Sequence, residues 1–495
     1  MQRFRLRNAV VLGAASLIPL ALVAPAATAS PTTRAGTAAA AAKASTAKAS
    51  TAAPAAKKSA PAHSRKIAMG FFEQWSIYGR GFSLAQADQE GEVKNLTDLV
   101  YAFGGVLPAQ GATTTPDAAS NPVTCQSVDA WADYQTPYLA DVNGGNPVGN
   151  NGLAGNFQQL RELKAKYPGL RPIMSLGGYT GSKFFSDAAA TRESRQAFVA
   201  SCIDTFVKGN LPGLTPGAAA GIFDGFDLDW EYPANNNGAA GNHYSPDDTR
   251  NYTLLAAEFR RQLDALGHQN GATYRLTTEM PVGLPNAKDL DVAGLARYVD
   301  DEVLMDYDFQ GPWTPQGATN FESNLFSSPF SPNTTAEPRI SVESSVRYFE
   351  SHGAPASKLV LGIPYYGHGW TGVPAGHTAG LYQPATGPAQ SPDITKQGTE
   401  LAGLDGTDPA GTTDYYEIVN QPGYTWHTDP ITQASWLYNP TTKTFWSMQN
   451  PREVYEKALY IGVRGLAGAS VWDLSADSNN ELTGALTKGL SVFGR

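Results

Sequence analysis

The chain has little cysteine and little histidine, and beyond its first 23 residues it has no long apolar run. No two of its seven histidines have the spacing of metal ligands on one helix. We therefore expect no bound metal and no cofactor. Without a later apolar run of about 18 residues or more, a mature protein would also lack a membrane span.

The two cysteines, Cys125 and Cys202, leave two states open. An oxidising compartment would allow a disulfide between them, and closing so long a loop would add about 2–4 kcal/mol to the free energy of unfolding. Two unlinked thiols remain the alternative.

Basic residues are scarce after position 66. Ten of the 36 Lys and Arg residues precede Ile67, and the first acidic residue is Glu73, so 26 basic residues stand against 45 acidic ones in the remainder. The resulting charge of about −19 argues against nucleic acid as a partner, because phosphates require basic patches. It suits a neutral or cationic substrate, although acidity also favours solubility.

The first 63 residues have the composition of a targeting segment followed by a spacer. Residues 1–29 combine a basic start, an apolar run over 10–23 and a small-residue cleavage site at 27–29, which predicts a secretory signal peptide. Residues 30–63 consist mainly of Ala, Thr, Ser, Lys and Pro, so they cannot bury a core and predict a disordered linker. We therefore expect a secreted, extracellular protein, monomeric and without membrane association in its mature form.

Short runs rich in β-branched and aromatic residues alternate with helical segments from residue 64 onward. Eight strand–helix repeats predict an α/β fold, a (β/α)8 TIM barrel over 64–370 and 446–495. Residues 107–150 are interpreted as an extended loop structure, and residues 371–445, between strands seven and eight, as a small α+β insertion. The predicted strands are 66–72, 98–103, 171–177, 223–231, 274–280, 302–307, 359–364 and 465–472.

The fourth predicted strand carries a row of acids. Side chains on a strand alternate between its two faces, so Asp227, Asp229 and Glu231 point one way and three large apolar residues point the other. A solvated edge would not carry that apolar face, and calcium sites draw their oxygens from flexible loops instead. Crowding and desolvation raise the pKa of such carboxyl groups, which is typical of sites that move protons. The row therefore predicts a catalytic site where the strand ends at the C-terminal face of the barrel.

Aromatic residues mark the ends of four other predicted strands. Trp75, Tyr307, Tyr366 and Trp472 each lie at or just after the end of a strand, so the barrel would gather them on one rim. Aromatic faces stack against the CH groups of sugar rings, which favours a carbohydrate substrate. Any one of them could be ordinary barrel packing, but the set at one rim indicates a binding cleft.

Four motifs together resemble glycoside hydrolase family 18, and specifically its bacterial chitinases. The signature Asp-Gly-x-Asp-x-Asp-x-Glu is complete at 224–231, Ser-x-Gly-Gly stands at 175–178, Met-x-Tyr-Asp stands at 305–308, and the closing tryptophan of strand eight is Trp472. The resemblance covers residue 67 to the C-terminus, including the insertion at 371–445. It implies a secreted enzyme that binds chitin and chito-oligosaccharides and hydrolyses β-1,4 linkages between N-acetylglucosamine units with retention.

The resemblance also implies a role for each motif residue. Glu231 would be the general acid, while the substrate's own 2-acetamido oxygen would attack the anomeric carbon and form an oxazolinium ion. Asp229 would turn between Asp227 and Glu231 and hold the acetamido N–H, and Tyr307 would hold the acetamido oxygen. The implied substrate-binding residues are Trp75, Tyr179, Tyr232, Met305, Asp308, Tyr366, His368 and Trp472. The implied structural residues are Asp224, Ser175, Gly177 and Gly178.

The chain departs from the family pattern at two of the substrate-binding positions. Tyr179 stands where the family usually has tryptophan, and His368 stands where arginine is common. Three alternatives remain: a non-catalytic chitin-binding lectin on the same barrel, an endo-β-N-acetylglucosaminidase acting on N-glycans, and a surface adhesion protein. The lectin would lack an acid at position 231, the glucosaminidase would lack the insertion, and the adhesion protein would leave the acid row unexplained.

Overall fold

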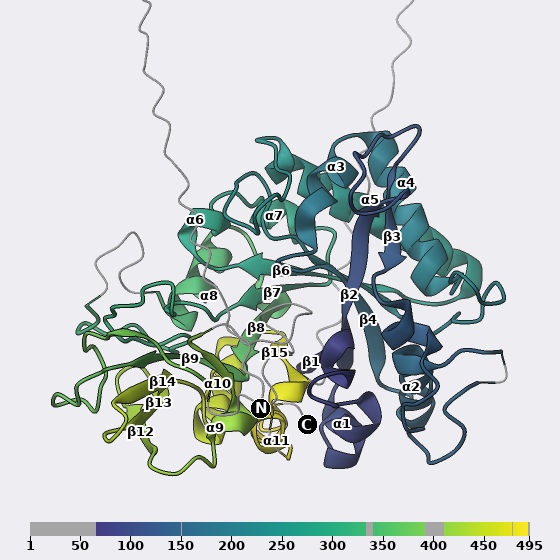
Figure 1. Ribbon diagram of the computed structural model, residues 1–495. Helices are drawn as coiled ribbons and strands as arrows, with labels where there is room; N and C mark the ends of the chain where they lie inside the picture. The colour runs from purple at the N-terminus through teal and green to yellow at the C-terminus, as the bar shows by residue number, and fades with distance from the viewer. Residues whose placement is uncertain (1–65, 150, 333–339, 392–409, 478, 494–495) are drawn as a thin grey trace, which may run out of the picture. The chain divides into compact units, whose positions relative to one another are not determined.

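Eight parallel strands close into a barrel (Figure 1). Their hydrogen-bonded order is β1-β15-β8-β7-β6-β5-β4-β2, and pairing of β1 with β2 closes the ring. The predicted (β/α)8 barrel is confirmed, and each of the eight predicted strands overlaps one barrel strand. The strands are β1 Ile67–Glu73, β2 Asp98–Pro108, β4 Arg171–Gly177, β5 Gly225–Asp229, β6 Arg275–Pro281, β7 Asp301–Met305, β8 Leu359–Pro364 and β15 Gly468–Trp472.

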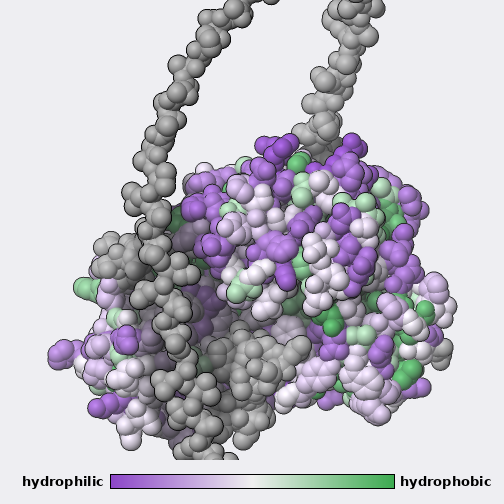
Figure 2. Space-filling view, turned by 45° about the horizontal axis from the view of Figure 1, so that its top comes forward, coloured by the Kyte–Doolittle hydropathy of each residue, from purple (hydrophilic) through white to green (hydrophobic). Residues whose placement is uncertain are grey.

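The computed structural model describes residues 66–149, 151–332, 340–391, 410–477 and 479–493. The predicted signal peptide, 1–29, and the predicted linker, 30–63, lie outside these residues. None of the described helices is both long and apolar enough to cross a membrane. On the face that Figure 2 shows, hydrophilic residues are interspersed with scattered hydrophobic ones.

The helices begin and end at residues suited to those positions. The helix α8 begins after Ser341, whose hydroxyl accepts the backbone N–H of Ser344, and α10 begins after Asn450 with the same kind of cap. Gly465 ends α10 in the left-handed region at φ 70°, so β15 begins three residues later than predicted. The α-helices are α1 Leu84–Glu90, α2 Gly155–Lys166, α3 Phe185–Ala189, α4 Arg192–Cys202, α5 Asp248–Asn270, α6 Leu284–Ala287, α7 Val292–Leu295, α8 Val342–Ser351, α9 Tyr415–Ile418, α10 Pro451–Arg464 and α11 Glu481–Leu490.

A second, antiparallel sheet lies between β8 and β15 in the chain, as the predicted α+β insertion requires. Its order is β10-β9-β14-β13-β12, with β11 paired to β9. Trp370, Trp436 and Phe445 pack in its own hydrophobic cluster. The sheet includes residues on both sides of the range 371–445, because β9 follows β8 after a single residue and β14 continues to Ser447. Its strands are β9 Tyr366–Thr371, β10 Gly387–Pro388, β11 Thr412–Asp414, β12 Thr425–Asp429, β13 Ala434–Asn439 and β14 Thr444–Ser447.

The segment 107–150 contains a strand that its sequence did not predict. Barrel strand β2 continues to Pro108 and pairs antiparallel with β3, Val123–Ser127. Cys125 on β3 is disulfide-bonded to Cys202 at the end of α4, 77 residues away. The extended-loop interpretation is therefore wrong for β3, because so short a strand depends on its pairing partner more than on its own pattern.

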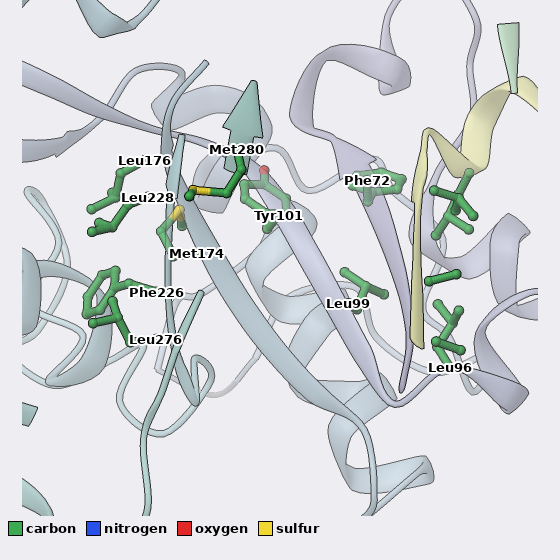
Figure 3. Close-up of a cluster of buried hydrophobic side chains, with 14 of the residues drawn as sticks. Phe72, Leu96, Leu99, Tyr101, Met174, Leu176, Phe226, Leu228, Leu276 and Met280 are labelled. Carbon is green, nitrogen blue, oxygen red and sulfur yellow. The ribbon is translucent and has the colours of Figure 1, made fainter. Parts of the chain in front are cut away.

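Apolar side chains of neighbouring barrel strands pack into one cluster that also includes residues of α2 and α5 (Figure 3). Phe226 and Leu228 of β5 join Leu176 of β4 in this cluster. Because side chains alternate along a strand, the same packing directs Asp227 and Asp229 to the opposite face of β5. The core thus determines which way the acid row points.

Candidate active site

The acid row begins deep in the barrel at Asp227. Ser175 of β4 donates a hydrogen bond of 2.7 Å to Asp227 Oδ2, and Thr277 of β6 donates one of 2.7 Å to Oδ1. Burial raises the pKa of Asp227 to about 6, although both hydroxyl groups favour its charged form. Two neighbouring strands therefore hold the innermost acid in one orientation.

Asp229 is the middle acid of the row, and one of its oxygens is unpaired. Its Oδ1 is buried and has no hydrogen-bond partner among the described residues. Burial raises the pKa of Asp229 well above its ordinary value, and the adjacent charges of Glu231 and Asp227 raise it further. A buried carboxyl group with an unpaired oxygen can accept a hydrogen bond from a bound molecule.

Two glycines allow the end of β4 to approach Asp229 closely. Gly177 has φ 103°, and a Cβ there would lie 2.4 Å from the carbonyl oxygen of Asp229. Gly178 has φ 79°, and a Cβ there would lie 2.6 Å from the ring of Phe103. Gly178 also donates its backbone N–H to Asp229 O at 3.0 Å. Both positions therefore need glycine for conformation and for space.

Glu231 is the outermost acid, two residues beyond the end of β5. Exposure rises along the row from 0% at Asp227 to 5% at Asp229 and 9% at Glu231. The backbone of Glu231 is fixed by Ser182, whose hydroxyl accepts its N–H at 2.9 Å. Burial raises the pKa of Glu231 to about 7 and the charge of Asp308 adds to this, while a hydrogen bond with Tyr232 opposes it.

A fourth acid, Glu279, was missed in the sequence. It lies on β6 two residues after Thr277, so the two side chains share a face. Glu279 is 3% exposed, and its Oε1 has no hydrogen-bond partner within the described part of the chain. Burial raises its pKa well above the ordinary value, and the charges of Asp227, Asp229 and Glu231 raise it further. An acid within a strand of apolar residues and threonines was the signal that could have identified it.

Tyr307 lies just after β7, whose last residue is the partly buried Met305. Its ring centroid lies 6.2 Å from that of Tyr366, in an edge-on contact. Burial raises the pKa of Tyr307 well above its ordinary value, and the charges of Glu279 and Asp229 add to this shift. The phenol therefore keeps its proton and can donate it in a hydrogen bond beside the acid row.

Asp308 differs from the acids of the row because it is stabilised in its charged form. Its Oδ1 accepts a 2.7 Å hydrogen bond from the hydroxyl of Tyr366 and lies 2.7 Å from His368 Nε2. Although half of the Asp308 side chain is exposed, desolvation by the neighbouring side chains acts to raise its pKa; His368 and Tyr366 outweigh this and lower the pKa below the ordinary value. The structure thus places a carboxylate whose pKa is lowered next to acids whose pKa values are raised.

Trp75 and Trp472, both predicted to bind a sugar, are joined by a third ring. Phe103 stacks on Trp472 at a centroid distance of 5.7 Å and contacts Trp75 at 6.0 Å. The ring centroid of Phe71 lies 5.1 Å from that of Trp472 in a tilted contact. Trp472 is only partly buried, so this group of rings offers an aromatic face at the C-terminal end of β15.

Asp224 does not join the acid row. It precedes β5, and its carboxylate forms an ion pair of 2.6 Å with Lys164 of α2. Its backbone N–H donates to Pro172 O and its carbonyl accepts from Arg275, so it ties β5 to both neighbouring strands. Tyr179, also predicted to contact the substrate, has a side chain that is half exposed.

Residues 67–477 match the sequence profile of Glycosyl hydrolases family 18. The chain belongs to this family. Chitinase A1 of Niallia circulans is 33% identical over 464 residues, covering 89% of this chain and 60% of that protein. Chitinase C of Streptomyces lividans is 32% identical over 429 residues, covering 85% of this chain and 59% of that protein. The catalytic domain of psychrophilic chitinase B from Arthrobacter TAD20 has a TM-score of 0.76 at 35% identity, covering 87% of this chain and 96% of that one.

The chain spans about three fifths of the length of these curated relatives. The range that matches the family profile, residues 67–477, contains the barrel strands, the small sheet and the acid row. Membership of family 18 therefore rests on the same part of the chain that forms the site.

Proposed function

We propose that the protein is a secreted chitinase that hydrolyses β-1,4 linkages between N-acetylglucosamine units with retention. The observation that carries the proposal is the state of Glu231, the outermost acid of a buried row, whose pKa is raised to about 7. A carboxyl group of that pKa holds its proton in much of the population near neutral pH and can act as a general acid. Family membership and the chitinase relatives support the substrate class.

In this mechanism Glu231 transfers its proton to the glycosidic oxygen as the bond to the anomeric carbon breaks. The substrate's 2-acetamido oxygen forms the new bond to that carbon, which gives an oxazolinium ion. Glu231, now a carboxylate, accepts a proton from the water that opens the ion. The acid is thereby restored, the anomeric configuration is retained, and no enzyme carboxylate needs to bond to the sugar.

The neighbours of Glu231 bind the acetamido group and the sugar. Asp229 accepts the acetamido N–H through its unpaired Oδ1 and turns between Asp227 and Glu231, and Tyr307 donates to the acetamido oxygen. Trp472 stacks beneath the ring, because its partly exposed face is supported by neighbouring aromatic rings. The ionised Asp308 accepts hydrogen bonds from sugar hydroxyl groups.

We expect kcat/KM on a soluble chito-oligosaccharide to fall as the pH rises through about 7. Glu231 must carry its proton to act as an acid, and its raised pKa keeps that proton bound at pH values where an ordinary glutamate has lost it. Because the carboxyl groups of the row interact, the alkaline limb reports their coupled titration. Rates measured in overlapping buffers give the profile, and a decline already complete below about pH 5 would contradict the assignment.

Hydrolysis of N-acetylchitohexaose tests the function as a whole. We expect shorter chito-oligosaccharides whose new reducing ends appear first as the β-anomer in proton NMR, because retention preserves the configuration. An initial α-anomer would contradict retention, and absence of cleavage would contradict the chitinase assignment. Release of N-glycans from a glycoprotein without cleavage of the hexamer would favour the endo-β-N-acetylglucosaminidase alternative.

A further inference from the structure

Asp308, Glu322 and His368, hereafter the rim trio, come from three segments that meet near Glu231. Asp308 follows β7, Glu322 lies between β7 and α8, and His368 lies on β9 of the small sheet. One carboxylate oxygen of each acid and one ring nitrogen of His368 all lie within 4.8 Å of one another. Two carboxylates and an imidazole are the donor types of many mononuclear transition-metal sites.

Glu322 is the member of the trio that the catalytic scheme leaves without a role. Its side chain is 1% exposed, and neither carboxylate oxygen has a hydrogen-bond partner among the residues that the structure describes. Lys457 is the basic residue nearby, but its Nζ is 2.9 Å from both Ser323 Oγ and Gln449 Oε1. Burial without a hydrogen-bond partner disfavours the charged form of this carboxyl group, and a bound cation would stabilise that form.

The other two members are already oriented as metal ligands usually are. His368 Nδ1 lies 3.4 Å from the carbonyl oxygen of Gly411, which leaves Nε2 directed toward Asp308. Tyr366 donates a 2.7 Å hydrogen bond to Asp308 Oδ1. Outer contacts of this kind orient imidazole and carboxylate ligands around a metal. Arginine, which the family pattern favours at position 368, has no lone pair to donate, so histidine supplies the nitrogen ligand.

We propose that the rim trio binds one divalent transition-metal ion of the Zn²⁺ type, and that the bound ion lowers turnover by withdrawing Asp308 from the sugar. Ligand atoms around tetrahedral zinc lie about 3.4 Å apart. Asp308 Oδ1 and His368 Nε2, hydrogen-bonded at 2.7 Å, must therefore separate to admit the ion, while all three ligand atoms start within 4.8 Å of one another. The half-exposed Asp308 side chain can rotate to achieve this, and water completes the coordination. Mg²⁺ prefers oxygen ligands and should bind poorly. Only the effect on turnover rests on the proposed chitinase function.

Calorimetric titration of the full chain with zinc chloride tests the binding site. We expect the wild type to bind one zinc ion per chain. The affinity for zinc should be at least ten-fold lower in Glu322→Gln and in His368→Gln. The exposed control Glu193→Gln should bind as the wild type does, and magnesium chloride should give no comparable saturation. The idea is overturned if zinc does not bind, or if both trio variants keep wild-type affinity. Melting temperatures without metal identify a variant that fails to fold, and the other variant then decides the result.

Hydrolysis of N-acetylchitohexaose with and without zinc tests the effect on turnover. We expect zinc at a saturating concentration to lower kcat/KM at least ten-fold in the wild type, and much less in Glu322→Gln, whose metal-free activity should be retained. Equal inhibition of both proteins would overturn the inhibitory role of the rim trio. Absence of hydrolysis without zinc would instead contradict the proposed function, and calorimetry would still report on the metal site.

Discussion

Glu231→Gln should retain less than about one per cent of wild-type turnover on N-acetylchitohexaose, because removal of a positioned general acid typically costs 10²–10⁴-fold. The amide has nearly the shape of the acid but carries no acidic proton for the glycosidic oxygen. Asp227, Asp229 and Tyr307 remain in place, so affinity for the oligosaccharide should be retained. Turnover is measured by product release under saturating substrate, and affinity by calorimetry on the same preparation.

The matched control is Glu193→Gln, which makes the same chemical change at an exposed position in the first turn of α4. It should hydrolyse the hexamer at the wild-type rate. Residual turnover of Glu231→Gln well above about one per cent would show that another group donates the proton. Glu279 would then be the next residue to replace, since it is a buried acid that interacts with all three acids of the row.

A hexamer whose sugar on the non-reducing side of the cleaved bond is glucosamine should not be hydrolysed at that bond. Glucosamine has no acetamido oxygen, so the bond to the anomeric carbon cannot form within the substrate. The rate of cleavage at that bond should fall at least about 10³-fold, as much as when an entire catalytic group is removed. The reason is that intramolecular attack has a large entropic advantage. Mass spectrometry of the products locates each cleaved bond.

The control is a hexamer deacetylated on the reducing side of the same bond. That sugar supplies only the leaving oxygen, so its bond should still be cleaved at a substantial rate. If the glucosamine-containing bond is cleaved nearly as fast as the fully acetylated one, the acetamido oxygen is not the nucleophile, and an enzyme carboxylate must either attack the sugar or activate the attacking water. Asp229 would be the first candidate, because it is adjacent to Glu231 and has an unpaired oxygen.

Local pattern in the sequence was enough to predict the barrel and the acid row. The period-two alternation around Asp227, Asp229 and Glu231 determines which side chains share a face, and the structure places the apolar residues between them in the core. The predicted bounds of the fourth strand, 223–231, were wrong at both ends: β5 spans Gly225–Asp229, and Glu231 lies beyond it. Strand β3 was missed, because it is held by pairing with the extended end of β2 and by the disulfide to α4, and not by its own composition.

Closure of the barrel decided what the sequence could not show. It brings Glu279 to the acid row and places Phe103 between Trp75 and Trp472. Packing of the segment after β7 against the small sheet gathers Asp308, Glu322 and His368, whose spacing along the chain matches no metal-binding motif. The raised pKa of Glu231 is equally a tertiary property, because it arises mainly from burial. The sequence by itself determined the residue types and which side chains share a face of each strand. The distances between those side chains and their desolvation exist only once remote segments have packed together.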